Sequence, residues 1–267
     1  MNRRHRGLLV AITAGALVLG APTAASAATT SGWWWGGHGR WQPPVTAPTP
    51  TPAPAPVADT GSSAPAASFV EDFNDYAATG LVAQTYKQAW QPYPDGTSGI
   101  YAPSKTVSVH DGVMDVQLGG AGTAGTFGTF AKAWGHVGGS FSVRAKATGG
   151  DGNGAAFMLW PTSGIWSDGE IDFPEGNFDE SPSAYHHSMT PGQESNRVQL
   201  GTGVSWRDWH TYKIDWVPGK SVTYSVDGRV LDTITHDVPW TPHRFMFQTG
   251  NWGDSGNLLI DWVSTTE

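Results

Sequence analysis

Short runs of apolar and aromatic residues, each ended by a turn signal, follow one another from residue 68 to the end of the chain. Two of them flank Asp227-Gly228, a dipeptide typical of the two-residue turn of a β-hairpin. No stretch repeats its apolar residues every 3.6 positions, as an amphipathic helix would. The pattern therefore predicts an all-β fold, a sandwich or jelly roll, with strands near residues 106–109, 113–118, 141–147, 155–160, 211–217, 222–226, 230–234, 245–248 and 258–263.

The first 27 residues have the pattern of a secretory signal peptide. Arg3, Arg4 and Arg6 precede an apolar run that is too short to span a bilayer, and Ala25-Ser26-Ala27 is a small-residue cleavage site. The pair Arg3-Arg4 also leaves twin-arginine export open as an alternative route. We expect the mature protein to be secreted and extracellular, with no membrane attachment once the signal is removed.

The next segment, residues 28–67, is rich in Trp and Gly and then in Pro, Thr and Ala. Such a composition predicts a disordered linker that is extended where proline dominates. Its tryptophans, at positions 33–35 and 41, either bind a polysaccharide or cell surface or have no defined role. Residues 68–267 show no internal break and no repeat, and we expect them to form one domain.

Charge and residue usage exclude several classes of function. The chain has 15 Lys and Arg against 23 Asp and Glu, and loss of the three leader arginines leaves a net charge of −11. Such an acidic protein is unsuited to nucleic acid or to anionic membranes, and we expect a monomer. The absence of cysteine excludes thiol nucleophiles and thiolate metal sites. The 14 tryptophans suit the flat faces of sugar rings, or simply a core.

The stretch 169–176 places three carboxylates, Glu170, Asp172 and Glu175, among apolar residues. Alternation along a strand puts the first two on one face. A β-bulge at Phe173-Pro174 would bring Glu175 to that face too, because proline inside a strand is typical of bulges and edges. Three carboxylates on one face repel one another, which indicates a chemical use. A calcium site or a solvated acidic edge is the alternative.

The motif and its flanks resemble glycoside hydrolase family 16, the concanavalin A-like β-glucanases and laminarinases. That family has the pattern E-x-D-x-x-E, with a glycine directly before it and an aromatic residue shortly before that, as Gly169 and Trp166 stand here. The resemblance implies a β-jelly-roll sandwich of two curved antiparallel sheets with a concave substrate cleft. It continues in order along the chain at GGSFSVRAK (138–146), AAFMLWP (155–161), WHTYKIDWVPG (209–219), VTYSVDG (222–228) and LLIDWVSTTE (258–267).

The resemblance also implies a role for each carboxylate. Glu170 is the expected nucleophile, Glu175 the general acid and then the general base, and Asp172 a hydrogen-bonding partner of Glu170. Retaining glycosidases need one ionised and one protonated carboxyl at the bond they cleave, so the two pKa values must differ. Crowding of like charges produces such a difference, because it raises the pKa of one member of the group.

Five further residues are expected to bind substrate. Trp166 is expected to stack on a sugar beside the cleaved bond, with core packing as the alternative. At positions 185–187, alternation puts His187 and Tyr185 on one face, and the resemblance assigns His187 to the carboxylates. The other three residues lie at and just beyond the end of an expected strand: Gln248, Asn251 and Trp252.

No cofactor is expected for catalysis. The resemblance raises a structural calcium, bound partly by an acidic residue of the last strand, and Asp261 matches that position loosely. An exposed aspartate is the alternative for this residue.

The expected function is a secreted, endo-acting, retaining glycoside hydrolase that cleaves β-1,3 or mixed β-1,3/1,4 glucan. The rivals are a lectin-like carbohydrate-binding module that lacks catalysis and a transglycosylase on the same scaffold. The sequence around Phe173-Pro174 and at 248–253 departs from that of glucanases. A galactan or another polysaccharide is therefore an alternative substrate.

Overall fold

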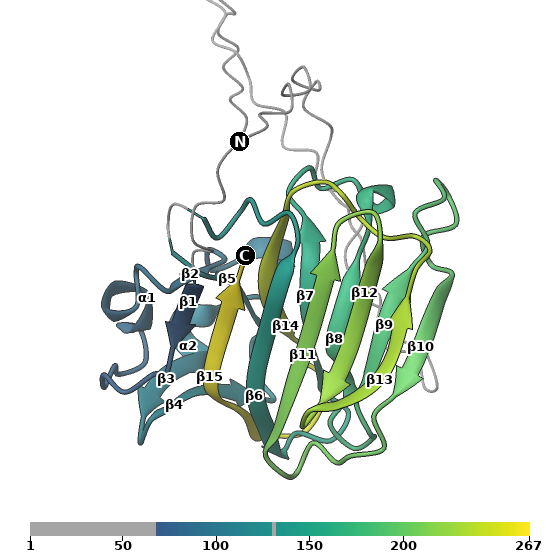
Figure 1. The fold of residues 1–267 in the computed structure, drawn as a ribbon. Coiled ribbons are helices and arrows are strands. Elements are labelled where there is room, and N and C mark those ends of the chain that lie inside the picture. The colour runs from purple at the N-terminus through teal and green to yellow at the C-terminus, as the bar shows by residue number, and fades with distance from the viewer. Residues whose placement is uncertain (1–67, 130–131) are drawn as a thin grey trace, which may run out of the picture.

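The computed structural model describes residues 68–129 and 132–267, so the expected signal peptide and linker lie outside the described residues. Two antiparallel sheets form the protein (Figure 1). One has eight strands in the order β13-β12-β11-β6-β15-β4-β3, with β1 also paired to β15. These strands are β1 (Ser68–Glu71), β3 (Val107–His110), β4 (Val113–Leu118), β6 (Gly139–Gly149), β11 (His210–Val217), β12 (Ser221–Val226), β13 (Arg229–Ile234) and β15 (Gly256–Thr266).

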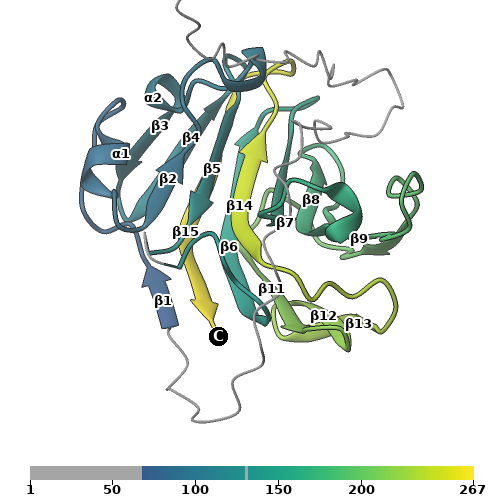
Figure 2. The ribbon, with the colours of Figure 1, turned by 90° about the horizontal axis from the view of Figure 1, so that it is seen from above.

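The second sheet has seven strands in the order β10-β9-β8-β7-β14-β5-β2. Its strands are β2 (Trp90–Pro92), β5 (Thr123–Phe127), β7 (Gly154–Pro161), β8 (Ile171–Asn177), β9 (Ser183–His187), β10 (Arg197–Gly201) and β14 (His243–Thr249). Two short helices, α1 (Val82–Thr85) and α2 (Pro103–Thr106), lie beside β2 and β3 at one edge of the sandwich (Figures 1 and 2). Two 3₁₀ turns complete the elements, η1 (Thr97–Gly99) and η2 (Trp166–Asp168).

The all-β jelly-roll prediction is confirmed, and every predicted strand falls on an observed one apart from Thr106, which ends α2. In the part of the chain that the structure describes, four strands were not predicted: β1, β2, β5 and β10. The reason is clearest for β5, whose five residues are all buried and therefore show no apolar–polar alternation. Within these described ranges, none of the helices has the length and apolar character needed to cross a membrane.

The main core lies between the two sheets and follows the alternation of the strands. Ile171 and Phe173 of β8 point into it, as the sequence pattern predicts. The ring of Phe173 meets Tyr212 and Tyr224 edge-on, at centroid distances of 5.4 and 5.7 Å. Burial of one such side chain stabilises the fold by roughly 1.5–3 kcal/mol, which anchors β8 against the opposite sheet.

The other face of the seven-stranded sheet carries a second, smaller apolar cluster, here called the outer cluster. All eight residues of β7 are buried, because this cluster covers one face of the strand while the main core covers the other. The outer cluster forms the floor on which the candidate site is built. Its buried members are Tyr101, Ala124, Ala156, Met158, Trp160 and Met246, with Tyr93, Ile100, Trp166 and Trp252 packed half-buried against it.

Candidate active site

A β-bulge in β8 brings the three carboxylates to one face. Along β7, Ala156 pairs with Glu175 and Met158 pairs with Asp172, so a single β7 residue lies opposite Phe173-Pro174. The pairing with β9 shifts at the same place. The peptide bond of Phe173-Pro174 is cis. The bulge therefore lies where the sequence predicted it, and it offsets the alternation by one residue.

The backbone conformation of Gly169 determines how the chain enters Glu170. Its φ is +112°, in a region that L side chains rarely adopt. A Cβ at this position would lie 2.4 Å from Cγ of Pro239, so only glycine fits without a shift. This explains physically why the residue before the first carboxylate is a glycine.

The carboxylates form a buried cluster with a histidine. Glu170, Asp172 and Glu175 are 1%, 0% and 6% exposed. Nδ1 of His187 lies 2.8 Å from the carbonyl of Glu194, to which it donates, and Nε2 faces Asp172 Oδ2 at 3.2 Å. Nδ1 also lies 3.9 Å from Glu170 Oε2. His187 therefore lies on the carboxylate face, as its alternation with His186 predicted, and its ring stands against two of the three acids.

His186 points the opposite way, into the protein. Its ring nitrogens contact the hydroxyl of Tyr224 at 2.8 Å and the carbonyls of His236 and Asp237 at 3.0 Å. These partners satisfy both nitrogens within the fold. Of the two neighbouring histidines, only His187 can serve the site.

The oxygens of Glu170 and Asp172 have unused hydrogen-bonding capacity. All four are buried, and none has a hydrogen bond of good geometry to another described residue. Native structures leave few buried polar atoms unsatisfied, and those few call for an explanation. Within the described part of the chain, this concentration of unsatisfied acceptors indicates a place prepared for a ligand.

Burial raises the pKa of every acid in the cluster, but to different extents. Burial and then the charge of Asp172 raise the pKa of Glu170 to about 8, against a lowering by His187 and by the nearby indole of Trp166. Burial and then the charges of Asp172 and Glu170 hold the pKa of Glu175 well above its ordinary value, and only Arg197 opposes them. Burial also raises the pKa of Asp172 to about 8. Glu170 therefore has more groups that favour its ionised form than Glu175 has, which separates the two glutamates electrostatically.

Trp166 and the residues around Gln248 lie on the same face. The indole of Trp166 packs against the outer cluster, 5.7 Å from the ring of His187. Gln248 is 3% exposed, and its Oε1 accepts a hydrogen bond of 2.6 Å from the hydroxyl of Tyr101. Gln248 pairs with Ala156, which pairs with Glu175, so it lies two strands from that carboxylate.

The loop after β14 is held by Asn153. The side-chain oxygen of Asn153 accepts hydrogen bonds from the backbone N–H groups of Trp252 and Gly253, at 3.1 and 2.9 Å. Trp252 packs half-buried against the outer cluster, and Asn251 beside it is half-buried as well. The structure thus gathers four of the five expected substrate residues around one floor, and Asn251 is at its margin.

Sequence reasoning missed Arg197 as a member of the site, and it placed Tyr185 on the face of His187 without giving it a role. Arg197 of β10 pairs with His187 of β9, and its guanidinium lies 4.6 Å from the centroid of the Tyr185 ring. Its charge lowers the pKa values of Asp172 and Glu175. Alternation with His187 marked Tyr185, but β10 was not predicted as a strand, so nothing brought Arg197 to this face.

A metal ion is the other use of clustered acids. Ligand atoms of Glu170, Asp172 and His187 lie within 4.8 Å of one another. Calcium prefers six to eight oxygen ligands, so two carboxylates and an imidazole suit it poorly. At Asp261, Nε of Arg144 donates a hydrogen bond of 2.9 Å to the carboxylate. A guanidinium at that distance does not fit a cation site.

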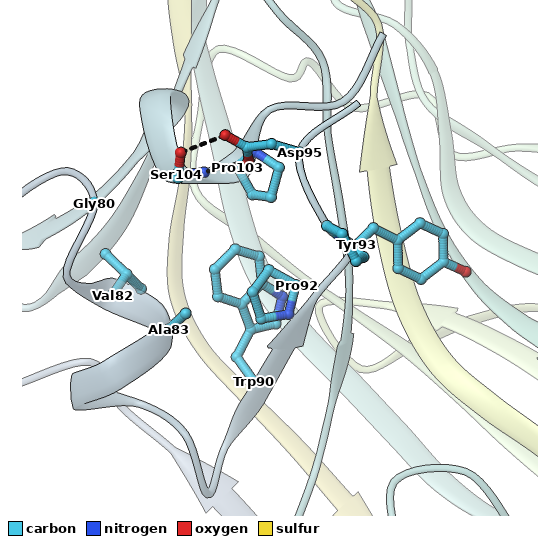
Figure 3. Close-up of a pocket in the computed structure, with 10 residues that line it drawn as sticks. Gly80, Val82, Ala83, Trp90, Pro92, Tyr93, Asp95, Pro103 and Ser104 are labelled. Atoms are coloured by element: carbon cyan, nitrogen blue, oxygen red, sulfur yellow. Dashed lines mark hydrogen bonds between the residues drawn. The ribbon is translucent and has the colours of Figure 1, made fainter. Parts of the chain in front are cut away.

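A pocket of about 150 Å³ lies away from the carboxylates, between α1, β2 and α2 (Figure 3). Among its lining residues the one carboxylate is Asp95, which accepts hydrogen bonds from the hydroxyl and the backbone N–H of Ser104. These bonds, the hydroxyl first, lower the pKa of Asp95. The pocket holds no crowded acids and no histidine, so it is not the catalytic site.

Comparison with known proteins agrees with this geometry. Residues 101–263 match the family model "Glycosyl hydrolases family 16". The chain is 29% identical to a β-glucanase of Bacillus subtilis over 130 residues, covering 48% of this chain and 51% of that protein. A β-glucanase of Paenibacillus macerans is 28% identical over 130 residues, covering 48% and 52%. The chain thus spans about half the length of the curated relatives it matches.

Solved structures share the fold. SCLam, a non-specific endo-β-1,3(4)-glucanase from family GH16, superposes with a TM-score of 0.60 at 16% identity, covering 74% of this chain and 89% of that one. A laminarinase from Flavobacterium sp. UMI-01 gives a TM-score of 0.58 at 19% identity, covering 74% and 99%. At these identities the likeness establishes the jelly-roll sandwich.

Proposed function

The chain belongs to glycosyl hydrolase family 16, and we propose that it is a secreted, endo-acting hydrolase that cleaves β-1,3 or mixed β-1,3/1,4 glucan with retention of configuration. One observation carries the proposal. The bulge in β8 aligns Glu170, Asp172 and Glu175 on one buried face, over an apolar floor, with His187 beside them. Family membership, the names of the β-glucanase relatives and the leader sequence support the substrate class and the secretion.

The first step forms a covalent intermediate. An ionised oxygen of Glu170 bonds to the anomeric carbon while the glycosidic C–O bond breaks, and Glu175 gives its proton to the departing oxygen. The high pKa of Glu175 keeps that proton on the acid, and the lowering of the pKa of Glu170 by His187 favours the ionised nucleophile. The surroundings thus oppose the ionisation of Glu175 with fewer compensating groups than that of Glu170, which is the direction of difference that the reaction requires.

The second step releases the sugar. A water molecule gives a proton to Glu175, its oxygen bonds to the anomeric carbon, and the ester bond to Glu170 breaks. Two inversions at one carbon restore the original configuration. Asp172 lies between the two glutamates along the chain, and its charge raises the pKa values of both, so its own protonation responds to each change in theirs.

A carbohydrate-binding module without catalysis is the rival from another class. A binding site needs hydrogen-bonding groups and aromatic platforms, but gains nothing from three buried acids that repel one another. The acids of this cluster have raised pKa values because burial and mutual repulsion disfavour their charges. That cost is explained by catalysis and is not explained by binding alone.

The test is a panel of laminarin, lichenan, agarose and carrageenan, with the freshly formed products examined by proton NMR. We expect internal cleavage of laminarin and lichenan, with the β-anomer of the new reducing end appearing first and mutarotation following. The matched control is Glu170→Gln, which keeps the shape of the side chain and removes its charge. Initial α-anomer would exclude the retaining mechanism, and activity that survives in the Gln variant would exclude Glu170 as nucleophile.

A further inference from the structure

The face that carries the carboxylates continues across β7 to β14. Leu159 of β7 pairs with Ile171, so the next β7 residue, Trp160, lies beside Glu170. Trp160 in turn pairs with Arg244 of β14. Arg244 alternates with Met246, a member of the outer cluster, and therefore shares its face. Two strand spacings separate Arg244 from Glu170, which is about 10 Å.

Arg244 is held between two aromatic rings at the margin of this face. Its guanidinium carbon lies 5.0 Å from the ring centroid of Trp134 and 5.9 Å from that of Tyr93. Nη2 donates a hydrogen bond of 2.7 Å to the hydroxyl of Tyr93. Within residues 68–129 and 132–267, no carboxylate forms an ion pair with this arginine. The arrangement fixes the guanidinium in place and leaves its charge uncompensated.

The rings of Trp134 and Tyr93 both lie on the face that carries the outer cluster. Trp134 is 42% exposed, an unusual fraction for the largest side chain. Tyr93 borders the pocket of Figure 3, but its ring points away from the residues labelled on the α1 side, Val82 and Ala83. Its hydroxyl instead donates to the sulfur of Met246 at 3.4 Å. The aromatic pair and the arginine thus extend the outer cluster beyond β14.

A similar contact on the other sheet shows what is unusual here. Trp209 also has cations over its ring, Arg144 at 5.5 Å and Lys146 at 5.0 Å. There, however, Arg144 is neutralised by Asp261 at 2.9 Å. At Trp209 the arginine therefore has a carboxylate partner, whereas among the described residues Arg244 has none and one of its rings is exposed.

We propose that Trp134, Arg244 and Tyr93 form a distal subsite for a sugar ring of the same polysaccharide chain whose bond lies at Glu170 and Glu175. The inference rests on the proposed function. A chain that crosses the strands from Glu170 passes Trp160 and reaches Arg244, so the subsite is continuous with the site of cleavage. The exposed face of Trp134 stacks on the pyranose ring, and the fixed N–H groups of Arg244 donate to its hydroxyls. Such a subsite binds long substrates and leaves short ones unaffected.

The experiment compares substrates of two lengths. Trp134→Ala is expected to lower kcat/KM on laminarin roughly fivefold, mainly through KM, and to leave kcat/KM on the shortest cleaved laminari-oligosaccharide within twofold. Arg244→Met is expected to follow the same pattern. Trp209→Ala, the matched control, removes an indole in contact with cations from the opposite sheet and is expected to change neither value. Equal losses on both substrates, or no loss on either, would overturn the subsite.

A binding measurement keeps this inference separate from the proposed function. If the wild-type protein cleaves none of the panel, the hydrolase proposal fails, and affinity electrophoresis in gels containing laminarin, lichenan, agarose or carrageenan then tests the subsite. Retardation of the wild type and of Trp209→Ala, with loss of retardation in Trp134→Ala, supports the subsite. Equal migration of all three proteins, with or without retardation, contradicts it.

Discussion

The outward faces of the two sheets use charge in opposite ways. On the eight-stranded sheet three carboxylates have cationic or imidazole partners: Asp261 lies 2.9 Å from Arg144, Asp215 lies 2.7 Å from Lys213, and Asp115 lies 3.0 Å from His110. On the seven-stranded sheet Glu170, Asp172 and Glu175 are buried together. Near them lie one histidine and one arginine, which lower individual pKa values without neutralising the group.

This difference separates charged groups that stabilise the fold from charged groups that are suited to catalysis. Paired charges near solvent add up to about 1 kcal/mol each, and removing one pair alters little else. Crowded buried acids oppose their own ionisation, because burial and repulsion both favour the neutral form. Strand alternation exposes polar residues on both sheets, so alternation alone does not distinguish the faces. The two faces are distinguished by the burial of carboxylates that lack compensating partners.

The largest expected contrast is in turnover. Glu170→Gln is expected to reduce the initial rate on laminarin by at least about 10³-fold, since a neutral amide cannot replace the attacking carboxylate. Asp261→Asn, an equally small change on the eight-stranded sheet, is expected to stay within twofold. Reducing-sugar assays on both purified variants, with far-UV circular dichroism as a check of folding, measure this. Comparable losses of initial rate in the two variants would contradict the proposed difference between the two faces.

A smaller contrast is expected in the pH profile. His187 lowers the pKa of Glu170, so His187→Asn should raise that pKa. The nucleophile then ionises only at higher pH, and the acidic limb of kcat/KM moves upward by up to about one pH unit. The control is His210→Asn, since His210 on the other sheet lies 2.6 Å from Asp227. A profile that loses height without moving would give His187 a purely structural role.

Stability should change in opposite directions on the two faces. The folded-state pKa of Glu175 is raised, so the stability linked to its proton is fully present below its unfolded pKa and is lost as pH rises through the folded pKa. Glu175→Gln cannot ionise, and it is expected to raise Tm at pH 8 by about 3 °C, with a smaller gain at pH 4. Asp215→Asn loses its partner Lys213 and is expected to lower Tm slightly. Thermal melts at both pH values decide this, and an equal gain at pH 4 and pH 8 would contradict the linkage.

The smallest effect is expected from breaking an ion pair on the eight-stranded sheet. Arg144 and Asp261 have side chains 34% and 39% exposed, so solvent screens their attraction. Arg144→Met is expected to lower the free energy of unfolding by no more than about 0.5 kcal/mol, a loss that added salt should reduce. Urea titrations at low and high salt provide the measurement. A loss of several kcal/mol would show that this face also carries strongly coupled charge.

Much of the site follows from local sequence rules. The alternation of Glu170 and Asp172 with Ile171 and Phe173 predicts which side chains enter the core, and the structure agrees. Pro174 predicts the bulge, because its missing N–H interrupts a sheet ladder. The same reasoning separates His187 from His186. Each of these predictions depends only on neighbours along one strand.

Other members of the site depend on pairing between distant segments. Arg197 reaches the carboxylates through the register of β10 on β9, and Gln248 through the register of β14 on β7. A shift of one residue in either register would turn the side chain to the opposite face. The strand β10 also carries too few apolar residues to be recognised from its pattern, since it lies at the edge of its sheet.

The sequence by itself determined the all-β class, the two-faced β8 and the order of the three acids, because these are properties of a strand's period of two residues. The tertiary structure alone decided how deeply the acids are buried, which of them His187 and Arg197 affect, and that Arg244 meets Trp134 and Tyr93. Burial and electrostatic coupling depend on distances across strands, and those distances are set only when the two sheets pair and pack.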